Sequence, residues 1–126
     1  MDASIEQGRA WRRFEKDYAA GYLRNRGMAV IAVDWKSGDA AADVVALDGD
    51  TLVIVSSRIY EGLTDFPEWH PTDAERNSRE NARAAFVKER PELAACEYRF
   101  DRIEVLKQGC MGVRMHHIDA FDLVQE

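Results

Sequence analysis

Residues 42–57 read ADVVALDGDTLVIVSS, and this segment sets the architecture. Two short apolar runs, Ala42–Leu47 and Leu52–Ser57, are separated by the sequence DGDT at positions 48–51. Apolar, partly β-branched runs on either side of Asp-Gly turn chemistry are typical of a β-hairpin. We therefore predict two antiparallel strands here, near the centre of a sheet.

The register of this hairpin determines which side chains share a face of the sheet. A two-residue turn at 49–50 places Asp43 opposite Ser56, and a turn one residue earlier places it opposite Ile54. Because side chains alternate between faces along a strand, both registers predict one shared face for Asp43, Ile54, Ser56 and Arg58. We therefore expect an ion pair between Asp43 and Arg58.

Apolar periodicity places the other elements around the hairpin. The first 26 residues favour a helix, because apolar and aromatic residues recur every three to four positions and Gly27 suits its end. A second helix is expected from Thr72 or Asp73 to about Arg90. Further strands are predicted at Ala29–Trp35, Tyr98–Lys107 and Val113–Ile118, with loops or turns at 36–39, 59–71 and 108–112. The order αβββαββ predicts an α/β protein with a mixed central sheet flanked by two main helices.

Length and charge restrict the classes of function. The 126 residues are 46% hydrophobic and 32% charged, which suits a single globular domain over residues 1–126. The net charge of −6 argues against non-specific binding to DNA phosphates, although residues 1–36 carry seven basic and five acidic side chains. No apolar run approaches the roughly 18 residues of a membrane span, and the first residues do not resemble a signal peptide. We expect a cytoplasmic protein that does not associate with membranes.

The cysteines and histidines do not form a recognisable metal-binding pattern. Cys96 and Cys110 are too few for a disulfide framework, and we expect reduced thiols. Together with His70, His116 and His117 they match no zinc spacing. The two adjacent histidines would also point to opposite faces of a strand, so they could hardly bind one metal ion.

Six segments resemble, in this order, the YraN-like family, an uncharacterised group of bacterial proteins predicted to have a restriction-endonuclease-like fold. Each is short, but together they follow the family's order at compatible spacing over most of the chain. They are Ala19…Leu23…Gly27-Met28, Val33-Asp34-Trp35-Lys36, Asp43-Val44-Val45-Ala46, Leu52-Val53-Ile54-Val55, Arg99-Phe100-Asp101 and His117-Ile118-x-Ala120-Phe121.

The resemblance implies a nuclease site of the PD-(D/E)xK type. In that scheme an acid on the first helix, Gly-Glu-x-Asp on one strand and Glu-x-Lys on the next hold a divalent metal such as Mg²⁺. Matched position by position, the helix acid falls on Lys16, the strand pair on Ala41 and Asp43, and the Glu-x-Lys pair on Ser56 and Arg58. The resemblance therefore implies a vestigial pocket in which Asp43 alone is retained.

Other acids of the first helix do not replace the missing ones in this alignment. Glu15 and Asp17 lie about 100° around the helix from Lys16, so we expect both to be too far from the pocket. A single carboxylate at Asp43, close to the cations Lys16 and Arg58, makes a poor Mg²⁺ site. We predict no metal site, with Asp43 as the ligand if there is any.

Arginines supply the only surface that we predict to contact phosphate groups. They follow helical spacing on the second helix and cluster on the first, at Arg12, Arg13, Arg76, Arg79 and Arg83. Acids are interleaved with those of the second helix, which favours a solvated, salt-bridged face over a binding surface.

Three hypotheses about function follow. The first, which the residues favour, is a catalytically degenerate nuclease-fold protein, not an enzyme, that binds nucleic acid or a protein partner. The second is an active Mg²⁺-dependent nuclease with a site rebuilt from Glu15 or Asp17, Asp43, and Glu61 or Asp65. The third is a structural or interaction protein, for example a homodimer. No cofactor is expected unless the second hypothesis holds.

Overall fold

The computed structural model describes residues 3–60, 70–108 and 110–118, and within these the side chains of 13–60, 70–107, 112, 113 and 115–118. Within the described residues, two long helices, one 3₁₀ turn and five strands follow one another. They are α1 (Ala3–Asn25), β1 (Ala29–Ser37), β2 (Ala40–Asp48), β3 (Thr51–Tyr60), α2 (Asp73–Glu89), η1 (Pro91–Leu93), β4 (Glu97–Gln108) and β5 (Cys110–His117).

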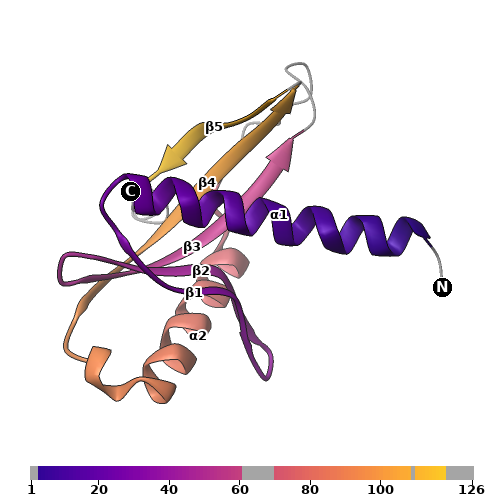
Figure 1. The fold of residues 1–126 in the computed structure, drawn as a ribbon. Helices are drawn as coiled ribbons and strands as arrows, with labels where there is room; N and C mark the ends of the chain where they lie inside the picture. The colour runs from indigo at the N-terminus through magenta and orange to yellow at the C-terminus, as the bar shows by residue number, and fades with distance from the viewer. Residues whose placement is uncertain (1–2, 61–69, 109, 119–126) are drawn as a thin grey trace.

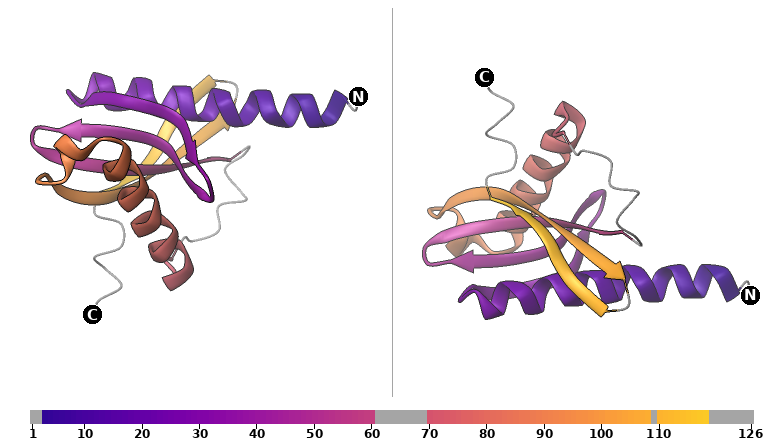
Figure 2. Two further views of the ribbon diagram at one scale, coloured as in Figure 1. Left: turned by 90° about the horizontal axis from the view of Figure 1, so that it is seen from below. Right: turned by 90° about the horizontal axis from the view of Figure 1, so that it is seen from above.

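The five strands form one mixed sheet in the order β1-β2-β3-β4-β5. Neighbouring strands are antiparallel except β3 and β4, which are parallel and are connected through α2 (Figure 1). Helices α1 and α2 lie on opposite faces of the sheet (Figure 2). This is the predicted α/β order αβββαββ, with the predicted hairpin at the second and third positions of the sheet. Within the described residues, neither helix combines the length and the apolar character of a membrane span.

Glycines in the left-handed region close the β1–β2 and β2–β3 hairpins. In the β2–β3 hairpin Asp48 pairs with Thr51, so residues 49–50 form the turn and the first of the two predicted registers is correct. Gly49 has φ 60° and Gly38 has φ 58°, values that a side chain would make costly. The expected loop at 36–39 is therefore a tight turn, and β1 runs on to Ser37.

Local signals set the ends of both helices. Gly27, with φ 90°, follows the end of α1, where the Met28 N–H donates to the Leu23 carbonyl at 3.1 Å. Thr72 caps α2 by accepting a hydrogen bond from the Glu75 N–H, as predicted. The strands are longer than predicted: β3 continues to Tyr60, and residues 61–69 of the expected loop lie outside the described residues.

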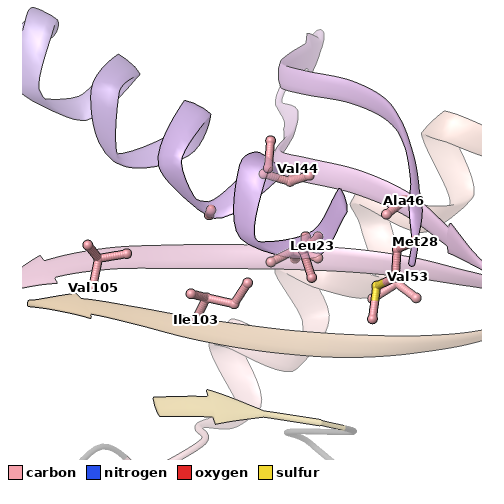
Figure 3. Packing of buried hydrophobic residues seen from close by; sticks show 10 residues of the cluster. Leu23, Met28, Val44, Ala46, Val53, Ile103 and Val105 are labelled. Atoms are coloured by element: carbon pink, nitrogen blue, oxygen red, sulfur yellow. The ribbon is translucent and has the colours of Figure 1, made fainter. Parts of the chain in front are cut away.

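The core has two halves, one on each face of the sheet. On the α1 side Ala19, Ala20 and Leu23 pack on side chains of β2, β3 and β4 (Figure 3). On the α2 side Ala82 and Phe86 pack on the opposite faces of the same strands. The side chains of the first half that Figure 3 labels are Leu23, Met28, Val44, Ala46, Val53, Ile103 and Val105. Burial on both faces fixes the centre of the sheet. It thereby positions the polar residues that follow the buried apolar residues along each strand.

Strand β2 breaks its alternation at Asp43, and this corrects the predicted face. Val44 packs on the α1 side and Val45 on the α2 side, as expected. Ala42 also packs on the α2 side, although period two assigns it to the face of Val44. Asp43 lies at this break, and its contacts place its carboxylate beside Ser57 and Lys16 of α1.

The neighbouring strand β1 changes face at the facing position. Val33 packs on the α1 side and Trp35 on the α2 side, so β1 changes face at the residue between them. That residue, Asp34, has φ 53°, a left-handed conformation that is uncommon for any residue except glycine. Asp34 and Asp43 stand opposite each other in the register of β1 and β2, and both turn toward α1.

Candidate functional site

The Asp43 carboxylate takes the place of a backbone hydrogen bond where the pairing of β2 with β3 ends. The pairing of β2 with β3 runs from Asp48 and Thr51 to Val44 and Val55. Beyond it, Oδ2 of Asp43 accepts a hydrogen bond of 2.8 Å from the Ser57 N–H. The carboxylate thereby supplies an acceptor to a backbone donor that would otherwise be costly to bury.

Lys16 reaches from α1 to two carboxylates of the sheet. Its Nζ lies 2.6 Å from Oδ1 of Asp34 and 3.7 Å from Oδ1 of Asp43, and 17% of its side chain is exposed. The hydrogen bond with Lys16 is the main reason why the pKa of Asp34 lies below its ordinary value of 3.8. One ammonium group therefore stands between acids from two strands.

Glu15 also faces this site, which corrects the expectation that it is too far from the pocket. Its side chain is buried, and Oε1 lies 3.1 Å from the Ser57 hydroxyl. Glu15 precedes Ala19 by one helical turn, as Lys16 precedes Ala20, and both alanines are buried. The buried face of α1 is thus wide enough for two adjacent positions.

The environment of Glu15 disfavours its ionised form. Burial is the largest cause that raises its pKa above the ordinary value of 4.5, and the nearby charge of Asp43 adds to it. The hydrogen bond with Ser57 and the charges of Arg58 and Lys16 oppose this shift. The Ser57 hydroxyl lies 3.4 Å from Oδ2 of Asp43 as well, and it has only one proton for two carboxylates.

We call Glu15, Lys16, Asp34, Asp43 and Ser57 the acid pocket. Its donor set does not fit a divalent cation, because the Lys16 ammonium already lies in contact with the two sheet carboxylates. Mg²⁺ needs several oxygen ligands around it and is repelled by a cation at that distance. Among the residues that the structure describes, no three acids, histidines or cysteines are grouped so that they could hold a metal ion.

The remaining residues of the predicted vestigial pocket lie elsewhere. Ser56 is buried, whereas Ala41 and Arg58 are exposed. Lys16, and not Arg58, is the ion-pair partner of Asp43 in the described part of the chain, so the predicted Asp43–Arg58 pair is wrong. Two acids proposed for a rebuilt site, Glu61 and Asp65, fall outside the described residues.

Helix α2 turns its arginines toward the sheet. Arg76, Arg79 and Arg83 are half-buried, and their Nε atoms have essentially no exposed surface. The guanidinium of Arg83 lies 4.1 Å from the centre of the Tyr98 ring. The expectation of a solvated face is therefore wrong for the Nε groups of these three residues, which are shielded from water.

The arginines of α1 behave differently from those of α2. Arg13 is exposed and pairs with Asp17 one turn later, at 3.1 Å. This pair has the character of an ordinary surface ion pair, which contributes little to stability. The side chain of Arg12 lies outside the described residues.

Three arginines on the α2 side form what we call the arginine cluster: Arg58, Arg79 and Arg102. Arg102 is 6% exposed, and its Nη2 donates to the Tyr60 hydroxyl at 3.1 Å. It stands beside Ser56 in the parallel β3–β4 register, and Arg58 follows Ser56 by two residues on the same face. Burial, followed by the charges of Arg58 and Arg102, lowers the pKa of Arg79, while Asp43 and Glu75 oppose that shift.

The two histidines of β5 point to opposite faces, as predicted. His116 Nε2 lies 2.8 Å from Oδ2 of the buried Asp101, and its Nδ1 lies 3.3 Å from the Tyr22 hydroxyl on the α1 side. His117 Nε2 lies 3.1 Å from Oε2 of Glu104. Cys96 is a free thiol, and the side chain of Cys110 lies outside the described residues.

Sequence comparison identifies several relatives of the chain, all called UPF0102 proteins. One, from Nitratidesulfovibrio vulgaris (strain DP4), is 34% identical over 119 residues, which is 87% of this chain and 82% of the relative. A relative from Paramagnetospirillum magneticum is 37% identical over 69% of this chain and 70% of its own length. A third, from Paenarthrobacter aurescens, is 28% identical over 79% of this chain and 83% of its own length. No protein-family model matches the chain. These identities over most of the chain confirm the resemblance of its motifs, and the chain belongs to the UPF0102, or YraN, family.

Proposed function

We propose that this protein is a catalytically degenerate member of a nuclease-like lineage that binds nucleic acid without cutting it. The observation that carries this proposal is the Lys16 ammonium, which lies 2.6 Å from Asp34 and 3.7 Å from Asp43. Hydrolysis of a phosphodiester by this class of site needs carboxylates that hold a metal ion and position a water molecule. Here the carboxylates hold an internal cation.

Removal of Lys16 from the pocket would be costly, which argues against a transient opening for metal. A displaced ammonium would leave the carboxylates of Asp34 and Asp43 facing each other with Glu15 nearby. Ion pairs that are mostly shielded from water are strongly destabilised when one partner is removed. We infer that the cation is a permanent part of the pocket.

The binding function is supported by the arginines of α2 and β4. Arginine forms bidentate hydrogen bonds with phosphate oxygens and is the preferred residue for that contact. In this protein Arg79 and Arg102 are withdrawn from bulk water, whereas most surface arginines are solvated. A cytoplasmic location, predicted from the sequence, agrees with such a ligand and stays a prediction.

The proposal is tested by incubation of the purified protein with single-stranded, duplex and branched DNA and with RNA, in Mg²⁺ or Mn²⁺. We expect no cleavage and a measurable affinity for at least one of these nucleic acids. That affinity should fall as the salt concentration rises, because phosphate contacts release counterions. An Asp43→Ala variant serves as the control: cleavage that this substitution abolishes would overturn the proposal, and cleavage that survives it would come from a contaminating nuclease.

A second candidate, an active nuclease with a rebuilt site, is favoured by one observation: Glu15 reaches the pocket that its sequence position seemed to exclude. With Asp34 and Asp43 it would supply acids from three elements. The same assay decides between the two, because only an active nuclease would require Glu15 for metal-dependent cleavage.

A further inference from the structure

Helix α1 carries an exposed aromatic ring on the face that turns away from the sheet. Phe14 is 48% exposed, whereas Ala19, Ala20 and Leu23 of the same helix are buried. The N-terminal turns of α1 extend beyond the strands (Figure 1, Figure 2). A single exposed apolar side chain is normal for a surface. The position of Phe14 becomes informative through a cavity that lies further along the same helix.

This cavity has a volume of about 510 Å³ and is formed by α1 together with β5. Such a volume is within the range of pockets that hold small organic ligands, so an aromatic side chain fits in it. The residues that line the cavity are Asp17, Tyr18, Gly21, Tyr22, Asn25 and Val113.

Gly21 keeps the cavity open. A Cβ atom at this position would meet no described heavy atom within 4 Å, apart from its chain neighbours and the backbone of its own helix. Glycine inside a helix is less favourable than alanine, because it loses more backbone entropy on folding. Packing within the described part of the chain therefore gives no reason for a glycine here. The missing side chain leaves room for one that comes from another molecule.

Phe14 and Gly21 lie almost on one line along α1. Seven residues make nearly two helical turns, so the two positions differ by about 20° around the helix and by about 10 Å along it. Consider two antiparallel α1 helices related by a two-fold axis that passes between Asp17 and Tyr18. Phe14 of each copy then stands opposite Gly21 of the other. A two-fold contact requires a patch that is complementary to itself, and a projecting ring beside an open cavity meets that requirement.

We propose that two copies of this chain associate through antiparallel α1 helices, with Phe14 of each copy inserted into the cavity at Gly21 of the other. A different protein would have to supply an aromatic side chain at this place, whereas this chain already has one at the required spacing. Asp17 lies near the axis in both copies, and Arg13 accompanies it as a counter-ion, with Nε 3.1 Å from Oδ1. The inference does not depend on the proposed nucleic-acid function.

Two substitutions remove the two halves of this contact separately. Phe14→Ala deletes the ring, and Gly21→Gln fills the cavity with the side chain of a good helix former. A single copy should tolerate both, because Phe14 is exposed and the space at Gly21 is open. At concentrations where the wild type is monomeric, both variants should therefore keep its circular dichroism spectrum. Met115→Ala, at another exposed apolar side chain, is the matched control.

Sedimentation equilibrium over a range of protein concentrations measures the association. We expect dimers for the wild type and for Met115→Ala. In Phe14→Ala and in Gly21→Gln the Kd of the dimer should rise about tenfold or more, because both buried aromatic contacts are lost. An equimolar mixture of these two variants should associate more tightly than either variant alone. The mixed dimer keeps one contact, between the Phe14 ring of the Gly21→Gln copy and the open cavity of the Phe14→Ala copy.

Three results would overturn the proposal. The first is a wild type that stays monomeric over the whole concentration range. The second is a dimer that tolerates both substitutions, because its interface would then lie elsewhere. The third is a loss of association in both variants that the mixture does not recover, since the pairing of Phe14 with Gly21 across a two-fold axis requires that recovery.

Discussion

Lys16 determines the chemistry of the acid pocket. Lys16→Ala should lower the free energy of unfolding by about 1–3 kcal/mol, because two mostly shielded carboxylates lose their cation. Arg24→Ala, at an exposed position of the same helix, should cost far less. Urea unfolding at neutral pH measures both, and equal effects would show that the Lys16 contacts contribute nothing specific.

The cost of Lys16→Ala should also depend on pH. The pKa of Asp34 is lowered in the folded state, so its pair with Lys16 stabilises the protein above the ordinary value of 3.8. That contribution is lost as the pH falls through the lower, folded-state pKa. Urea unfolding at a series of acidic pH values should show the difference between wild type and variant becoming smaller, and a difference that stays constant would contradict the pair.

Glu15 should change the stability of the protein with pH in the opposite direction. Its pKa is raised by burial, so the folded state holds a proton that the unfolded chain releases above about the ordinary value of 4.5. The protein therefore loses stability as the pH rises from that value through the raised pKa. In Glu15→Gln this loss should disappear, whereas Asp17→Asn, at an exposed position, should follow the wild type. Unfolding curves between pH 4 and 7 that stay parallel for wild type and Glu15→Gln would refute the assignment.

The sequence identified some residues of the pocket and missed others. Motif alignment found Lys16 and Asp43, because it needs only the order of residues along the chain. It missed Asp34 and Ser57, which reach the pocket through a left-handed residue in β1 and a gap between β2 and β3. No residue type marks either feature, since the conformation of Asp34 is imposed by its tertiary contacts. Glu15 was detectable, because it lies one turn before the buried Ala19.

Among the secondary-structure elements, the junction between β2 and β3 depends on Asp43. Asp43→Ala should cost about 1–3 kcal/mol, because the Ser57 N–H loses its acceptor. The reason is this hydrogen bond and not the Asp43–Arg58 ion pair that was expected from the sequence. Asp43→Asn keeps a carbonyl oxygen at that place and should cost less. Amide hydrogen exchange at Ser57 gives a local readout: it should accelerate in the alanine variant far more than in the asparagine variant, and equal rates would contradict the role of Asp43.

Elements were predictable where local chemistry determines them. Gly49 and Thr72 gave a turn and a helix start because their backbone preferences do not depend on the rest of the protein. The strands were predicted too short, because polar residues such as Arg58 continue β3 by pairing with β4. That pairing joins segments far apart in the sequence, so the strand's own residues cannot reveal it.

Across the protein as a whole, two groups of charged residues lie toward the two helices, and the charges of Asp43 and Arg58 each act on the other group. The acid pocket lies under α1 and contains an internal cation, while the arginine cluster lies toward α2. The fold order was predictable from apolar periodicity together with family motifs. The placement of the charged groups was not predictable, because the spacing of the α2 arginines is typical of a solvated face. Their shielding follows only from the packing of the helix on the sheet.

The proposed function depends on whether Lys16 keeps metal ions out of the acid pocket, and calorimetric titration of the wild-type protein with Mn²⁺ measures this. We predict no saturable binding at millimolar Mn²⁺, because the ammonium neutralises and occupies the carboxylates of Asp34 and Asp43. Lys16→Glu, which replaces the cation with a further oxygen ligand, should acquire a binding site. Saturable binding of Mn²⁺ by the wild type that is lost in Asp43→Asn would contradict the cation-filled pocket, and with it the claim that this protein binds nucleic acid without cutting it.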